Sequence, residues 1–252
     1  MIDLTNRVAL ITGASRGIGA AAALRFAEAG ASLVVNYSTH EAEAHRVAEA
    51  ARARGVRAIA VQCDVSRFDD VRSLFERALD EYGRIDIVVA NAGIWTGGAI
   101  DRLDEQSWQQ TIDVNLKGVY ACCHFAAQVM KRQRSGRIIT VSSTAGQRGE
   151  ALHSHYAASK GGIISLTKSI ASELGPYGVT ANVVAPGWVD TDMSAEPLHD
   201  AREIENILKA IPLGRVAEAD DIAGPILFLA SDLARHITGE VINVNGGSVM
   251  CG

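Results

Sequence analysis

Short apolar segments alternate along the chain with longer segments in which apolar residues recur every three to four positions. The short segments lack the polar alternation of a half-exposed strand, so we expect both of their faces to be buried. They predict strands at residues 7–12, 32–36, 57–65, 85–93, 136–143, 179–187 and 240–245.

The longer segments have the spacing of amphipathic helices. The longest is predicted from about residue 104 to 133, and others lie near residues 200–210 and 218–231. Thr39 is the expected N-cap of a helix at residues 39–55.

Strands and helices alternate without a linker rich in proline, glycine or serine. This order predicts one α/β domain over residues 1–252, in which helices cover both faces of a parallel sheet through right-handed crossovers. We expect the segment at about residues 190–212 to form a mobile lid over the substrate.

Composition and charge argue against several classes of function. The 252 residues carry a net charge of −5, which gives no basis for a nucleic-acid partner. No apolar run approaches the ~18 residues of a membrane span, and the first residues lack the basic start of a signal peptide. The four cysteines show no metal-binding spacing, so we expect no metal and a reduced, cytoplasmic protein.

A glycine-rich loop, "TGASRGIG", joins the first predicted strand to the first predicted helix. Gly13, Gly17 and Gly19 allow a tight turn and a close approach of a ligand to the backbone. Free N–H groups at the start of the helix favour a phosphate there. In this strand–helix context the loop predicts dinucleotide binding.

The end of the second strand indicates which dinucleotide is bound. An NAD enzyme of this type usually has an acid there, which accepts a hydrogen bond from the ribose 2′-hydroxyl. This chain has the uncharged residues Asn36, Tyr37 and Ser38, and Arg16 in the glycine loop offers a cation for a 2′-phosphate. The sequence favours NADP(H), with NAD(H) as the alternative if Arg16 is only a solvated loop residue.

Tyr156 and Lys160 are four positions apart in a segment typical of a half-buried helix, so they share one face. An ammonium about 4 Å from a phenolate contributes roughly 4 kcal/mol at an effective dielectric near 20, which lowers the pKa of the phenol. Burial has the opposite effect. The pair predicts general acid–base chemistry, and an exposed pair without chemistry is the alternative. Ser143 adds a hydroxyl at the carboxyl end of a strand, where doubly wound folds bind ligands.

Taken together and in this order, "TGASRGIG", "ANAG", "DVNLKG", Ser143, "YAASK" and "APGWVDT" resemble the motifs of the short-chain dehydrogenase/reductase family. The resemblance covers essentially the whole chain. It implies a single Rossmann-type domain with a doubly wound, seven-stranded parallel sheet flanked by helices. It also implies a homotetramer and hydride transfer between a nicotinamide and a carbonyl carbon.

The resemblance implies four catalytic roles. Tyr156 would be the general acid in carbonyl reduction and the base in alcohol oxidation. Ser143 would hydrogen-bond the substrate oxygen, Lys160 would hold the nicotinamide ribose and lower the pKa of the phenol, and Asn115 would hold a water that links Lys160 to solvent.

Cofactor contacts are implied in the same way, with Ala90 as a small departure at the start of the "NAG" loop. The implied contacts are Gly13, Ser15, Arg16, Gly17, Ile18, Gly19, Ser38, Asp64, Val65, Asn91, Ala92, Gly93, Tyr156, Lys160, Pro186, Gly187, Val189 and Thr191.

Within the family, "VVNYS", "GRIITVSS", "VVAPGWVDTDM" and "ITGEVINVNGG" resemble the 3-oxoacyl-acyl-carrier-protein reductases. The implied reaction is NADP(H)-dependent reduction of a 3-oxoacyl thioester or related ketone. Ser172 replaces an arginine that members acting on carrier protein often have, and Lys131, Arg132 and Arg134 are possible substitutes. Carrier-protein binding is therefore left open.

Two alternatives remain: an NAD(H)-dependent dehydrogenase of alcohols, polyols, sugars or steroids, and a non-catalytic dinucleotide-binding protein. The loss of a catalytic group would support the second, and none is lost. On the substrate side, Trp95 and Trp188 are candidate pocket walls. Glu150, His153 and His155 are candidate hydrogen-bonding groups for a polar substrate, and residues at the rim of the pocket without such a role are the alternative.

Overall fold

The computed structural model describes residues 2–251, in which seven parallel strands form one sheet in the order β3-β2-β1-β4-β5-β6-β9. The order reverses between β1 and β4, as in doubly wound folds. This confirms the predicted fold class. The strands are β1 (Val8–Ile11), β2 (Ser32–Tyr37), β3 (Ala58–Gln62), β4 (Ile87–Ala90), β5 (Gly136–Val141), β6 (Val179–Pro186) and β9 (Val241–Val244).

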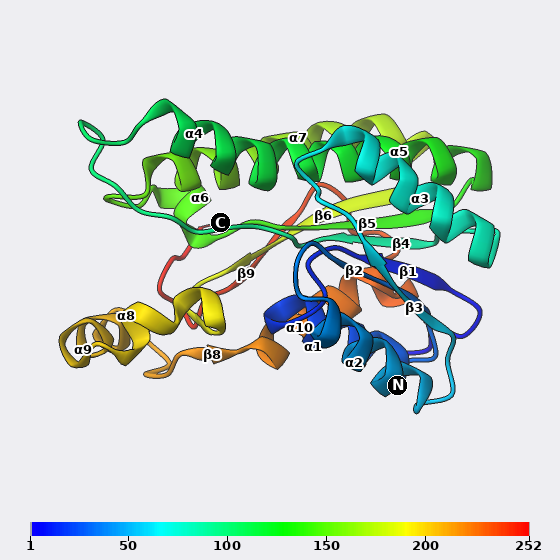
Figure 1. The fold of residues 1–252 in the computed structure, drawn as a ribbon, viewed down its shortest axis with the longest axis horizontal. Coiled ribbons are helices and arrows are strands. Elements are labelled where there is room, and N and C mark those ends of the chain that lie inside the picture. The colour runs from blue at the N-terminus through cyan, green and yellow to red at the C-terminus, as the bar shows by residue number, and fades with distance from the viewer. Residues whose placement is uncertain (1, 252) are drawn as a thin grey trace.

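Helices cover both faces of the sheet, which explains why the strands are apolar on both sides (Figure 1). One layer contains α1 (Gly17–Glu28), α2 (Glu41–Arg52) and α10 (Ala219–Ala230). The other contains α3 (Phe68–Tyr82), α4 (Glu105–Ile112), α5 (Gly118–Gln133), α6 (Thr144–Arg148) and α7 (Ser154–Leu174).

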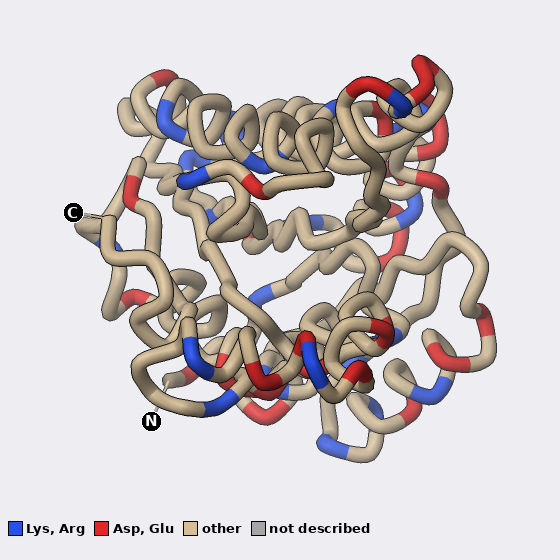
Figure 2. The backbone as a smooth tube through the Cα atoms, turned by 90° about the vertical axis from the view of Figure 1, so that its left-hand side faces the viewer, with Lys and Arg blue, Asp and Glu red and all other residues tan. Residues whose placement is uncertain are grey.

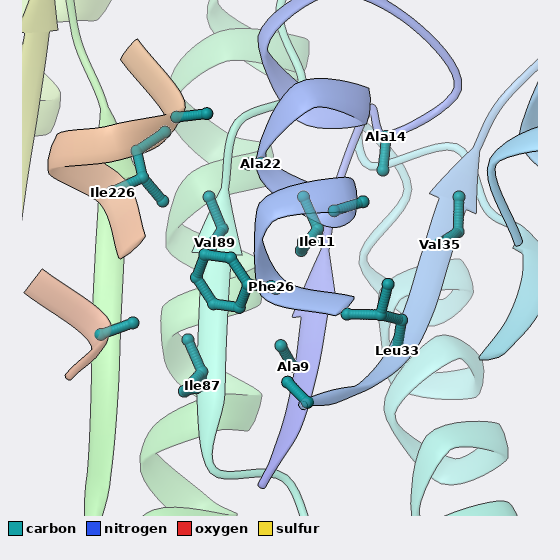
Figure 3. Close-up of a cluster of buried hydrophobic side chains, with 14 of the residues drawn as sticks. Ala9, Ile11, Ala14, Ala22, Phe26, Leu33, Val35, Ile87, Val89 and Ile226 are labelled. Carbon is teal, nitrogen blue, oxygen red and sulfur yellow. The ribbon is translucent and has the colours of Figure 1, made fainter. Parts of the chain in front are cut away.

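Phe26 is at the centre of the core on the α1 side of the sheet. Its ring is fully buried and lies among side chains of β1 and β4, including Ile11 and Val89 (Figure 3). The other buried residues of α1 are mostly alanine or glycine, so the helix can lie close to the strands. Burying such a ring contributes roughly 1.5–3 kcal/mol to the free energy of unfolding.

The long helix predicted at residues 104–133 is interrupted by one π-helical turn, η1 (Asp113–Lys117), between α4 and α5. Turns of this kind often occur at functional sites. The predicted cap at Thr39 is wrong, because α2 begins at Glu41 and its N-cap is His40. The Thr39 hydroxyl instead lies 3.0 Å from Nδ1 of His40.

The predicted lid, residues 190–212, contains two short helices, α8 (Ala195–His199) and α9 (Ala201–Lys209). Figure 1 shows them at the periphery of the fold, apart from the two helix layers. The segment is flanked by the two-residue strands β7 (Val189–Asp190) and β8 (Ala217–Glu218), which pair in parallel. Strand pairing therefore joins both ends of the segment, which the sequence pattern did not predict.

Positively and negatively charged residues are intermixed along both helix layers (Figure 2). Arg25 on α1, for example, pairs with Asp220 on α10. This mixture gives no support to a nucleic-acid surface. Within residues 2–251, no helix is both long and apolar enough to cross a membrane.

Candidate active site

A cavity of about 560 Å³ opens at the carboxyl ends of the strands, across the point where strand order reverses. Of the predicted catalytic and cofactor-binding residues, all line this cavity except Gly19 and Asn115. The chain therefore brings together motifs that are spread over some 180 positions of sequence, from Gly13 to Thr191.

The glycine loop fits closely against its neighbours at two positions. Gly13 has φ +61°, and a Cβ there would lie 2.9 Å from the Cα of Ala92. A Cβ on Gly19 would lie 2.3 Å from the carbonyl oxygen of Gly13. The side chain of Arg16, the N-cap of α1, makes no capping hydrogen bond. The first N–H groups of α1 thus have no capping side chain, which fits the pyrophosphate of a dinucleotide.

Three polar side chains brace this loop. The Thr12 hydroxyl accepts from the backbone N–H of Asn91 at 3.0 Å and of Ala92 at 3.1 Å. Nδ2 of Asn91 donates to the Thr12 carbonyl at 2.9 Å, and Oδ1 of Asn36 accepts from Gly13 N–H at 3.2 Å. In the sequence, Asn36 is notable only for its lack of charge. A polar amide at the end of an apolar strand, buried in the structure, is the signal that indicates its bracing role.

Arg16 and Ser38 line the same end of the cavity. The guanidinium of Arg16 makes an ion pair with the carboxylate of Asp192, 2.9 Å away. Both side chains are at least half exposed, so the pair contributes at most about 1 kcal/mol. Arg16 therefore spans the entrance between the glycine loop and the lid.

Three of the four predicted catalytic side chains meet at the other end of the cavity. Ser143 follows β5 and is the N-cap of α6, whereas Tyr156 and Lys160 are one turn apart on α7. Nζ of Lys160 lies 5.6 Å from the centre of the Tyr156 ring and donates to the carbonyl of Val141 at 2.9 Å. Both side chains are buried, with exposed fractions of 9% for Tyr156 and 5% for Lys160.

Burial dominates the proton affinity of both groups. It raises the pKa of Tyr156 to about 12, with a hydrogen bond from Ser143 lowering it and the charge of Glu150 raising it. It lowers the pKa of Lys160 to about 8. The lowering of the phenol's pKa by Lys160, which the spacing of the two residues predicts, is wrong: burial raises the pKa of Tyr156, and the group that lowers it is Ser143.

Asn115 lies in the π-helical turn and directs its amide toward the loop after β4. Its Oδ1 accepts from Ile94 N–H at 2.8 Å, and its Nδ2 donates to the Ile94 carbonyl at 2.9 Å and to the Ser159 hydroxyl at 3.3 Å. A Cβ placed on Gly93 would lie 3.3 Å from Oδ1 of Asn115 and 3.5 Å from Nζ of Lys160. Asn115 is thus a neighbour of the lysine although it does not line the cavity.

The substrate side of the cavity is lined by both predicted tryptophans, Trp95 and Trp188, and by Glu150. Gln110, Arg148 and Met193 also line it and belong to no motif that could have identified them. Of the candidate hydrogen-bonding groups, His153 and His155 do not line the cavity. His155 faces the protein interior. It is fully buried, and its Nε2 lies 2.9 Å from the Thr96 hydroxyl.

No metal site accompanies these groups: among residues 2–251, no three histidine, cysteine, aspartate or glutamate side chains gather closely enough to hold an ion. The three buried cysteines are Cys63, Cys122 and Cys123. Burial raises the pKa of each thiol, so all three stay protonated in the core.

Comparison with known proteins shows the family of this chain. A family model described as "Enoyl-(Acyl carrier protein) reductase" matches residues 13–249. A short-chain type dehydrogenase/reductase from Mycobacterium marinum superposes with a TM-score of 0.93 at 37% identity, covering 99% of this chain and 98% of the other. The chain belongs to the short-chain dehydrogenase/reductase family, as the motifs predicted.

Two curated relatives cover nearly the full length. A 3-oxoacyl-[acyl-carrier-protein] reductase of Synechocystis sp. is 45% identical over 251 residues, which is 99% of this chain and 100% of the relative. An L-rhamnose 1-dehydrogenase (NAD(P)(+)) of Azotobacter vinelandii is 42% identical over 248 residues, 97% of each chain. The chain is an oxidoreductase of this family and is similar to its 3-oxoacyl-[acyl-carrier-protein] reductases.

Proposed function

We propose that the protein reduces a carbonyl to an alcohol with NADP(H), and that its substrate is a 3-oxoacyl thioester or a related ketone. The convergence of Ser143, Tyr156 and Lys160 on the cavity that also contains the glycine loop carries the proposal. The similarity to 3-oxoacyl-[acyl-carrier-protein] reductases supports the substrate class.

The buried tyrosine suits the reductive direction. A phenol with a pKa of about 12 keeps its proton at neutral pH, so Tyr156 is a proton donor to the carbonyl oxygen as negative charge develops there. Ser143 donates a hydrogen bond to the same oxygen and stabilises that charge. The bound nicotinamide cofactor supplies the hydride.

Lys160 would hold the nicotinamide ribose, because it is the ammonium nearest to the tyrosine on the same helix face. Its bond to Val141 leaves further donors on the ammonium for ribose hydroxyls. Asn115 keeps the backbone of Ile94 in place beside this lysine. In the proposed role it positions a water that returns protons to Lys160 and from there to the phenol.

The preference for NADP(H) rests on the entrance of the cavity. Ser38 provides a hydroxyl and Arg16 a guanidinium, and the exposed Asp192 that now pairs with Arg16 is a weak competitor for a phosphate dianion. Asn36 and Tyr37 are buried and uncharged, so the end of β2 has no carboxylate to bind a free 2′-hydroxyl.

A sugar or alcohol dehydrogenase is the second candidate, because one relative of nearly equal similarity is an L-rhamnose 1-dehydrogenase.

Binding of carrier protein has weak support. Lys131 and Arg134 are two of the cations that could substitute for the arginine that Ser172 replaces, but both stack on the ring of Tyr177. A free or CoA-linked substrate fits these contacts better than a carrier-linked one. We also propose a homotetramer, from the family alone.

The test is NADPH oxidation at neutral pH with acetoacetyl-CoA, with NADH in parallel. Turnover with NADPH and little with NADH supports the proposal. Turnover only of L-rhamnose or other alcohols with NAD⁺ would favour the second candidate. Absence of turnover with any ketone or alcohol would contradict both.

A further inference from the structure

Two tryptophans from distant parts of the chain form one corner of the cavity. Trp95 follows β4 and Trp188 lies between β6 and β7, and their ring centroids are 5.9 Å apart with the planes at 83°. The corner is close to the reacting groups, because Gly93, two residues before Trp95, lies against Nζ of Lys160. Any substituent on the substrate carbonyl that extends in this direction meets two indoles.

The indole of Trp95 is held by His153. The two rings are stacked with centroids 4.3 Å apart and planes within 5° of parallel. Nδ1 of His153 donates to the Ala151 carbonyl at 3.1 Å, which fixes the imidazole. The stack needs glycine at position 97, because a Cβ on Gly97 would lie 2.8 Å from Nε2 of His153.

Further hydrogen bonds join the loop that carries Trp95 to the start of α7. Gly98 N–H donates to the Leu152 carbonyl at 2.7 Å, and the Thr96 hydroxyl lies 2.9 Å from Nε2 of His155. Rotation of Trp95 out of the cavity would break the ring stack while these bonds hold its backbone. The indole is therefore a rigid wall and not a mobile gate.

Glu150 adds a carboxylate to the side of the cavity that Trp95 and Trp188 line. Its carboxylate lines the cavity, is 22% exposed and lies 3.8 Å from Nδ1 of His153. Glu150 and Tyr156 line the same cavity, and the charge of Glu150 raises the pKa of the phenol. Arg148 lines the cavity too but makes no ion pair with Glu150. An apolar chain laid along this side would strip water from the carboxylate, which is costly.

We propose that Trp95, Trp188 and Glu150 form a specificity wall that restricts the enzyme to carbonyl compounds with a short substituent on the side facing Trp95. For 3-oxoacyl thioesters this means an acetoacetyl group and not a long acyl chain. The inference rests on the proposed function, and it assigns to His153 and Gly97 the role of positioning Trp95. In a packed pocket, each methylene group beyond the length that fits lowers kcat/KM by roughly tenfold or more.

The test compares acetoacetyl-CoA with 3-oxooctanoyl-CoA as substrates for NADPH oxidation. Wild-type protein should prefer the short substrate by at least about tenfold in kcat/KM. Trp95→Ala should reduce this preference by about tenfold by raising the value for the long substrate. His153→Ala, which removes the support but keeps the indole, should reduce it to a smaller extent. Trp108→Ala, an exposed tryptophan on α4, is the matched control and should leave the preference unchanged.

A binding measurement separates failure of the wall from failure of the proposed function. With NADP⁺ present, butyryl-CoA should bind more tightly than octanoyl-CoA, and Trp95→Ala should remove the difference. Length selection in binding without turnover of either ketone would overturn the proposed function and support the wall. Equal kcat/KM for both ketones in wild-type protein, or a preference that Trp95→Ala and His153→Ala both leave intact, would overturn the wall.

Discussion

Lys160 places its ammonium 5.6 Å from the centre of the Tyr156 ring and binds the carbonyl of Val141, the last residue of β5. The lysine is therefore held by the sheet as well as by its own helix. Because both side chains are buried, the phenol keeps its proton and the ammonium becomes easier to deprotonate. At neutral pH Tyr156 and Lys160 are both protonated. The proposed reduction of a carbonyl requires this state.

Tyr156→Phe should abolish reduction while NADPH still binds. The change removes the proton donor but keeps the ring that fills the buried position, so we expect a loss of about 10²–10⁴-fold in kcat. Steady-state rates with acetoacetyl-CoA and fluorescence titration with NADPH measure the two effects. Tyr120→Phe, at a half-exposed tyrosine of α5, is the control. A Tyr156→Phe enzyme with wild-type turnover would refute the assigned role.

The rate of reduction should fall above about pH 8. Below this pH Lys160 is protonated, and above it the ammonium is lost while Tyr156, with its pKa near 12, remains protonated. If the ammonium is required, kcat/KM decreases by about tenfold per pH unit on the alkaline side. Initial rates between about pH 6 and 10 test this. A profile that stays level to pH 10 would exclude Lys160 as the titrating group.

Arg16→Ala should weaken NADPH binding much more than NADH binding. The change removes a charge-assisted hydrogen bond to the 2′-phosphate, worth about 1.5–3 kcal/mol or roughly 10–100-fold in Kd. Asp192→Asn is the matched control, because it releases Arg16 from its ion pair and should leave NADPH binding at least as tight. Equal losses for the two cofactors in Arg16→Ala would argue against a 2′-phosphate site at Arg16.

Gly19→Ala should disrupt the glycine loop, since the new Cβ would lie 2.3 Å from the carbonyl of Gly13. We expect at least about tenfold weaker dinucleotide binding and a lower melting temperature. Gly224→Ala on α10 is the control, because a Cβ there meets nothing within 4 Å. That change should stabilise the helix by about 0.5–1 kcal/mol. Calorimetry measures the melting temperatures of the two variants, and NADPH titration measures their binding. Unchanged NADPH binding in Gly19→Ala would contradict the close fit of Gly19 against Gly13.

Most of the fold could be predicted from local sequence. Continuous apolar strands, the glycine-rich loop after the first strand and the helix spacing between strands are signals that lie within about 15 residues of one another. The prediction of a helix start failed where the capping residue depended on a contact between side chains. Thr39 has the chemistry of a cap, but its hydroxyl pairs with His40 and the helix begins one residue later.

By itself, the sequence determined the strand–helix order and predicted the proposed phosphate-binding loop and the candidate catalytic residues Ser143, Tyr156 and Lys160, because each is encoded in a short motif. Tertiary structure alone decided the pKa of the tyrosine, since the burial that raises it depends on the elements packed around α7. It also decided the wall of the substrate site. The stack of Trp95 on His153 joins residues 58 positions apart, and only a distance in space reveals such a contact.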